Sequence, residues 1–173
     1  MNVTITDRDL GWNKIKQELL ALNKKIVKVG VTAEKGKVIP KGERKRKDVR
    51  IVEYAYWNEF GVYGKKNWSI PPRPFVGGWA DNKREDVVKT EQELFMGVSG
   101  GTMDSETAFK ALGEFGRSGI LAYIRDSGNF VPNAPLTIKI KGSDKPLIDE
   151  GFLLNAIAYE IVSKNEQSGE DES

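Results

Sequence analysis

Residues 69–75, SIPPRPF, constrain the fold more than any other stretch, because they contain three of the chain's seven prolines. Proline removes a backbone N–H donor and clashes with the preceding turn of a helix. The residue before each proline is also pushed toward extended geometry. We therefore expect a stiff, extended arm here. The arm ends in Arg73 and Phe75, and arginine and aromatic residues are enriched at interface hot spots.

The composition is typical of a soluble globular protein, with 39% hydrophobic and 30% charged residues in a chain of 173. This length suits one domain that can bury a core. No apolar run approaches the roughly 20 residues that a membrane span needs, so we expect no membrane partner. Cysteine and histidine are absent, which excludes disulfides, thiol chemistry and the commonest general base and metal ligand.

Charge is concentrated in two opposed segments. Residues 41–50, KGERKRKDVR, carry six basic and two acidic side chains, whereas residues 164–173 carry one basic and four acidic ones. The acidic segment is expected to be a disordered tail, which leaves residues 1–163 as a single domain. The basic loop at 34–48 has three interpretations: a solvated surface loop, a docking site for an acidic protein face, or a site facing DNA phosphates. The DNA-facing candidates are Arg44, Lys45, Arg46, Lys47 and Arg50.

Periodicity predicts an α+β fold, with about four helices packed on a small, mostly antiparallel sheet of three to four strands and with long extended loops. The expected helices span residues 7–23, 51–60, 81–96 and 105–126. The expected strands span residues 25–33, 136–142 and 156–162. For residues 51–60 a strand is the competing interpretation, and Gly61 as a C-cap favours the helix. Residues 34–48 are expected to form a long loop or a mobile hairpin, and further irregular segments are expected at 62–79 and 97–104.

Two segments resemble signatures of the tailed-bacteriophage neck and tail-completion proteins, a group that includes Mu-type virion morphogenesis and tail-terminator-like proteins. The first is YAYWNEFGVYGKKNWSIPPRPF at 54–75, where an aromatic–Glu–Phe–Gly segment precedes an Ile-Pro-x-Arg-Pro-Phe segment. The matching residues are Glu59, Phe60, Gly61, Ile70, Pro71, Arg73, Pro74 and Phe75.

The second segment is KPLIDEGFLLNAIAYEIV at 145–162, which is similar to a Pro-Leu-x-Asp-Thr-Gly-x-Leu signature that runs into a final strand. The matching residues are Pro146, Leu147, Asp149, Gly151 and Leu153. The segment departs from the family pattern at Glu150, where threonine is usual, and at Ala156, where serine is usual. The order and spacing of the two segments also fit the family.

The resemblance implies a non-enzymatic structural protein of the virion neck, assembled in the host cytoplasm, that needs no cofactor or metal. The implied partners are copies of itself in a ring, with six as the expected number, the adjacent neck, connector and tail-tube or sheath proteins, and packaged double-stranded DNA. The implied interface residues are Ile70, Pro71, Arg73, Pro74, Phe75, Glu59 and Phe60. Asp149 and Gly151 are expected to shape a structural turn. The roles of tail terminator, tail-completion protein and head-closure protein stay open.

Arg73 lies between two prolines, so its backbone is held in place and its side chain suits a fixed partner. We expect that partner to be a carboxylate, on an adjacent subunit or in the same domain. Two other functions stay open: a DNA-binding or regulatory module that uses residues 41–50, and a metal-dependent nuclease that uses Glu53, Glu59 or Asp149. No clustered carboxylate spacing supports the nuclease.

Overall fold

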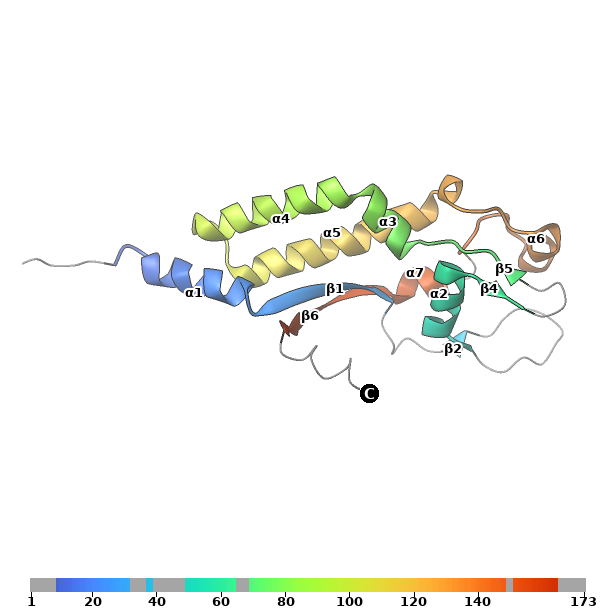
Figure 1. Cartoon of the computed structure of the whole chain (residues 1–173), viewed down its shortest axis with the longest axis horizontal. Helices are drawn as coiled ribbons and strands as arrows, with labels where there is room; N and C mark the ends of the chain where they lie inside the picture. The colour runs from blue at the N-terminus through green and yellow to red at the C-terminus, as the bar shows by residue number, and fades with distance from the viewer. Residues whose placement is uncertain (1–8, 32–36, 39–48, 65–68, 149–150, 165–173) are drawn as a thin grey trace, which may run out of the picture.

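The fold is α+β, and its largest part is a long helical hairpin lying on one face of a two-stranded sheet (Figure 1). The computed structural model describes residues 9–31, 37–38, 49–64, 69–148 and 151–164. The basic residues Arg44, Lys45, Arg46 and Lys47, together with Asp149 and the acidic segment after Lys164, lie outside these ranges.

The hairpin consists of α4 (Arg84–Ser99) and α5 (Ser105–Arg125). Helix α5 begins where the Asp104 side chain accepts a hydrogen bond from the Thr107 N–H, at 2.7 Å, which satisfies one of the free donors of its first turn. At the end of the molecule where the chain turns from α4 into α5, α1 (Trp12–Leu22) packs against both helices. The expected helices at 7–23 and 105–126 are thus present, with slightly different ends.

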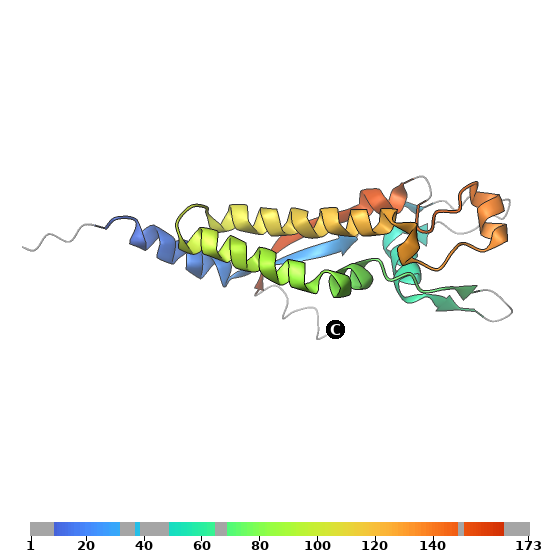
Figure 2. The same ribbon diagram turned by 90° about the horizontal axis from the view of Figure 1, so that it is seen from above.

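The sheet pairs β1 (Lys25–Val31) with β6 (Ile157–Ser163) in antiparallel register, with Val29 opposite Tyr159. Glycines on α5 let the sheet approach closely: a Cβ atom on Gly113 would lie only 2.3 Å from Cδ2 of Tyr159. Because such a contact is too short for real atoms, the helix and the sheet fit together in this arrangement only with glycine at this position. Figure 2 shows β1 and β6 running alongside the hairpin.

The opposite end of the molecule is built from short elements (Figures 1 and 2). They are β2 (Lys37–Val38), β3 (Val49–Arg50), α2 (Ile51–Phe60), β4 (Val62–Tyr63), β5 (Ser69–Ile70), α3 (Val76–Asn82), η1 (Ser127–Asn129), α6 (Pro135–Lys141) and α7 (Phe152–Ala156). Strand β2 pairs with β3, and β4 pairs with β5. The core continues into this end through a cluster that includes Phe75, Trp79, Ile120, Phe130 and Leu153.

Several predicted elements differ from the structure. The expected strand at 136–142 is the helix α6, which begins at Pro135 and is closed by Gly142 in the left-handed conformation, at φ 74°. Proline at the first helical position and glycine just past the end are strong helix signals, and they outweigh the alternation of the sequence TIKIK. Among the residues that the structure describes, the strands form three separate antiparallel pairs instead of one sheet of three to four strands.

All three expected loops contain regular structure, and the one at 34–48 holds β2. The segment at 62–79 holds the β4–β5 pair and the start of α3, and α4 continues to Ser99, beyond the expected boundary at 97. None of the described helices is both long and apolar enough to cross a membrane.

Candidate interaction site at the proline-rich segment

The Glu59 carboxylate caps the helix that follows the proline-rich arm. Its Oε2 atom accepts hydrogen bonds from the Phe75 and Val76 N–H groups, at 2.8 and 3.0 Å, and Oε1 accepts one from Gly77 at 2.8 Å. These donors stand at the beginning of α3, where backbone N–H groups have no partner within the helix and negative charge is favoured. Glu59 therefore joins the end of α2 to the start of α3 inside one chain.

Arg73 is buried, with 7% of its surface exposed, and binds the segment that precedes α6. Its Nε donates to the Val131 carbonyl at 2.9 Å, and Nη2 donates to the Pro132 carbonyl and to Oδ1 of Asn133, both at 3.3 Å. Asn133 in turn donates to the Asp144 carbonyl at 3.2 Å. The arginine thus connects the proline-rich arm to the segments on both sides of α6.

The hydrogen-bond partners of Arg73 differ from the predicted carboxylate. Each of the three recorded acceptor atoms in the described structure is a neutral oxygen. Burial lowers the pKa of Arg73 from its ordinary value, while the nearby Tyr54 opposes that effect. A guanidinium keeps its charge in proteins, so these hydrogen bonds are made by a buried cation and are stronger than neutral ones.

The two halves of the first signature pack directly on one another. The Arg73 N–H donates to the Asn58 carbonyl at 2.6 Å. Gly61 has φ 75°, and a Cβ atom there would lie 3.0 Å from both the Ile70 carbonyl oxygen and Cδ of Pro72. Glycine is required at this point for two reasons, the left-handed backbone and the close approach of the arm. We call Glu59, Gly61, Arg73 and Phe75 the clasp.

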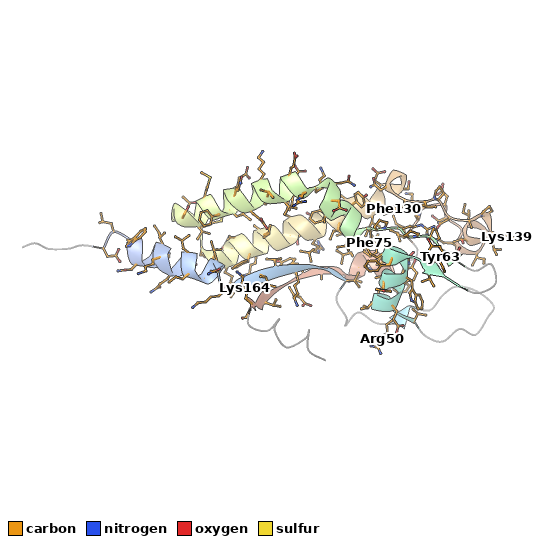
Figure 3. The ribbon with its side chains drawn as sticks, viewed as in Figure 1. Arg50, Tyr63, Phe75, Phe130, Lys139 and Lys164 are labelled. Carbon is orange, nitrogen blue, oxygen red and sulfur yellow. The ribbon has the colours of Figure 1, made fainter. Side chains whose placement is uncertain are left out.

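Phe75 ends the arm inside the core and is only 1% exposed. Figure 3 shows it beside α2, in the interior of the same end of the molecule as Phe130. The cluster that contains Phe75 also contains Leu147 and Leu153 of the second signature. The two sequence segments that resemble the phage family, which end at residue 75 and begin at residue 145, therefore meet in one core.

The described part of the second signature contains two residues with positive φ and the start of α7. Gly151 has φ 77° and occupies the position just before this helix, while Leu147 has φ 61°, which is uncommon for a residue with a side chain. The structural turn was predicted from Asp149 and Gly151 together; Asp149 lies outside the described residues, so the turn stays a prediction.

Three aromatic side chains close in sequence to the clasp residues Glu59 and Gly61 are exposed, namely Tyr56, Phe60 and Tyr63, and we call them the aromatic stripe. Their exposed fractions are 60%, 64% and 83%. The Tyr56 and Phe60 rings contact each other with centroids 4.8 Å apart, and Figure 3 shows Tyr63 beyond α2, toward the far end of the molecule. Of these three residues, only Phe60 was predicted from the sequence to be an interface residue. Tyr56 lies four residues before Phe60, on the same side of α2, whereas Ala55 is buried. This helical spacing was the sequence signal that Tyr56 is exposed together with Phe60.

The remaining predicted interface residues lie around the clasp. Ile70 and Pro71 are half-buried and Pro74 is exposed. Arg50, the one DNA-facing candidate in the described part of the chain, is exposed, and its N–H donates to Oε2 of Glu53 at 3.1 Å, at the start of α2. Within the described ranges no group of three acidic side chains is arranged to hold a metal ion.

No family model, curated protein or solved structure shows a significant match to this chain. The interpretation of the site therefore depends on its own geometry and on the resemblance of the two signatures.

Proposed function

We propose that this protein is a structural component of the neck of a tailed-phage virion, a ring-forming tail-completion or tail-terminator protein that joins the tail to the head connector. The observation that carries this proposal is the meeting of the two signature segments. Glu59, Arg73 and Phe75 of the first segment and Leu147 and Leu153 of the second belong to one connected structural unit. Residues that match a family pattern and also depend on one another physically support the resemblance better than separate matches do.

The chemistry of the site favours binding over catalysis. The Glu59 carboxylate accepts hydrogen bonds from three backbone N–H groups, and the Arg73 guanidinium donates to two carbonyl oxygens and one amide oxygen. Both charged groups are thus committed to holding the arm in place. The exposed part of the site is aromatic, and aromatic side chains supply large contact area at interfaces with little loss of conformational entropy.

In this proposal the clasp fixes the position of the aromatic stripe, and the stripe contacts a neighbouring ring of the neck. A preorganised surface loses less entropy on docking than a mobile one. The virion neck is the proposed location, and an adjacent connector or tail protein is the proposed partner of Tyr56, Phe60 and Tyr63.

The test is genetic complementation in the phage that encodes the chain. A variant with Tyr56→Ser, Phe60→Ser and Tyr63→Ser is expected to fold with an unchanged circular dichroism spectrum but to leave filled heads and tails unjoined in electron micrographs. Leu20→Ser is the matched control, because Leu20 is 54% exposed on α1, far from the stripe. Normal joining by the triple variant would refute the role of the stripe, and absence of the protein from purified virions would refute the function.

A further inference from the structure

The backbone hydrogen bonds of the β1–β6 sheet use only the sides on which the two strands face each other. The Lys164 N–H donates to the Lys24 carbonyl at 2.9 Å, in the same register that runs through both strands. In an antiparallel pair, opposite residues alternate between hydrogen-bonded and non-hydrogen-bonded positions. The hydrogen-bonded pairs are therefore Ile26 with Val162, Lys28 with Glu160, and Gly30 with Ala158.

Both outer edges of this sheet are left unpaired within the described part of the chain. The backbone groups that point outward belong to the residues between the bonded pairs, chiefly Val27 and Val29 on β1 and Tyr159 and Ile161 on β6. None of these four makes a recorded backbone hydrogen bond to a described residue outside the sheet. The β6 edge is regular over seven residues and contains no proline. Because natural proteins usually blunt such an edge, its persistence indicates that a further strand pairs with it.

The side chains show how a second sheet would be oriented. Val29 and Tyr159 face α5, where Gly116 and Gly113 leave room for them. On both strands, the residues whose backbone groups point outward are thus the ones that face the hairpin. If β1 of another copy is hydrogen-bonded to β6, opposite residues share a face of the sheet, so the hairpins of both copies lie on the same side.

The charges in the middle of the sheet favour β1 as the partner of β6. Lys28 and Glu160 are exposed, lie opposite each other within one copy, and belong to the face away from the hairpin. Addition of β1 from a second copy brings another Lys28 toward Glu160 on that face, and opposite charges on neighbouring strands are stabilising. A symmetric pairing of two β6 edges would instead bring two Glu160 carboxylates together.

The other charges near the sheet lie at the end next to α1. Lys25 interacts electrostatically with Glu106 of α5, and Nζ of Lys164 donates to Oδ1 of Asn23 at 3.2 Å. Lys24 lies just before β1 and Lys164 just after β6. These lysines are at the strand ends, and the middle of the two strands has no charged residue besides Lys28 and Glu160.

We propose that the outer edge of β6 pairs with the outer edge of β1 from a second copy of this protein, in antiparallel orientation, so that two sheets become one. Both edges belong to seven-residue strands of the same chain. Repeating the strand pair without turning it over keeps every neighbouring strand antiparallel. The contact is therefore heterologous and can continue around a ring, which leaves no edge unpaired. The proposal rests on the proposed function for the choice of a ring, and it names the surface through which ring neighbours meet.

The first test uses single cysteines in separate chains, because the chain has no cysteine of its own. Lys28→Cys marks β1 and Glu160→Cys marks β6. Facing and diagonal positions on paired strands lie about 5–8 Å apart, which a short bis-maleimide spans. The cross-linker is expected to join the two variants when they are mixed at high concentration, but neither variant to itself. Lys28→Cys mixed with Gln92→Cys is the control and should give no product, because Gln92 is exposed on α4, which α5 separates from the sheet (Figure 1).

Amide hydrogen exchange followed by NMR tests the contact in the unchanged chain. In dilute protein, the amides of Tyr159 and Ile161 are expected to exchange quickly, whereas the amide of Val162, which is bonded to β1, is protected. In concentrated protein, exchange at Tyr159, Ile161 and Val27 is expected to slow together by at least about tenfold, because both edges become paired.

The outcomes separate this contact from the proposed function. Protection of both edges in dilute, monomeric protein would overturn the proposal, because the chain itself would then cover them. Slower exchange on β6 alone, or a product from Glu160→Cys by itself, would show a symmetric contact and would also overturn it, as would no 28–160 product in concentrated protein and in particles. Particles that carry the protein in the neck without this link would refute the contact and keep the function. A mixed dimer of a protein that never enters particles would support the contact and refute the neck role.

Discussion

Replacing Arg73 with alanine tests the clasp directly. The substitution removes three hydrogen bonds from a buried cation and leaves the Val131 and Pro132 carbonyls and the Asn133 amide oxygen without this donor. An unsatisfied buried polar group costs about 1–3 kcal/mol. Water can reach some of these atoms once the side chain is gone, so we expect a total loss of about 3 kcal/mol in the free energy of unfolding.

Urea denaturation followed by circular dichroism measures this quantity. For a domain of this size, a loss of about 3 kcal/mol corresponds to a fall of roughly 6–12 °C in the melting midpoint. Arg73→Lys is expected to recover less than half of the loss, because one ammonium group cannot reproduce the planar geometry in which Nε and Nη2 reach separate acceptors.

Arg125→Ala is the control, since Arg125 is exposed at the end of α5. It is expected to change stability by less than about 0.5 kcal/mol. If Arg73→Ala stays as close to the wild type as this control, the clasp does not stabilise the domain. That result would instead favour the other possibility considered from the sequence, in which Arg73 acts on an adjacent subunit.

Three further substitutions test neighbouring parts of the structure by the same unfolding measurements. Glu59→Gln keeps the shape but removes the charge that caps α3, and is expected to cost about 1–2 kcal/mol. Gly113→Ala places a methyl group against the Tyr159 ring and is expected to cost about 1–3 kcal/mol; stability at the wild-type level would show that the sheet can shift. Hydrogen bonds from Ser105 lower the pKa of Glu18 from its ordinary value of 4.5. The stability that these bonds contribute is fully present above the ordinary value and is lost as the pH falls through the lowered pKa. Ser105→Ala should reduce this pH dependence of the unfolding free energy.

The parts of the fold that were predictable are those in which local pattern and tertiary packing agree. Helix α5 repeats apolar residues at helical spacing, and Ile120 and Ile124 of that repeat are fully buried. Strand β1 alternates, and Val29 faces the core as the alternation predicts. Helix α6 was wrongly predicted as a strand because Ile138 and Ile140 alternate with lysines, which is a strand-like pattern. The residues that set the ends of this helix are Pro135 and Gly142.

The site was predictable in its members but not in its contacts. Glu59, Arg73 and Phe75 were selected from the resemblance, yet the acceptors of Arg73 lie about sixty residues further along the chain. Periodicity carries no signal for a pairing of that separation between two irregular segments. The exposure of Val88 and Phe95 on α4 was equally hidden, because these residues fit the expected helix whether they face the core or solvent.

A comparison of Phe60 with Phe75 tests whether different residues of the first signature serve stability and assembly. Both are phenylalanines of the same signature, but Phe60 is largely exposed and Phe75 lies fully inside the core. Phe75→Ala is therefore expected to cost about 3–5 kcal/mol through the cavity that it creates, whereas Phe60→Ala should change stability by less than about 0.5 kcal/mol.

The effects on assembly are expected to be reversed at a temperature where both variants are folded. Phe60→Ala removes part of the aromatic stripe and should reduce head–tail joining, while folded Phe75→Ala keeps the stripe and should join at a rate set by the amount of native protein. The measurements are chemical unfolding and the yield of joined particles per folded molecule. A pair of variants with equal losses in both assays would refute the division, because it would mean that the clasp and the aromatic stripe do not act separately.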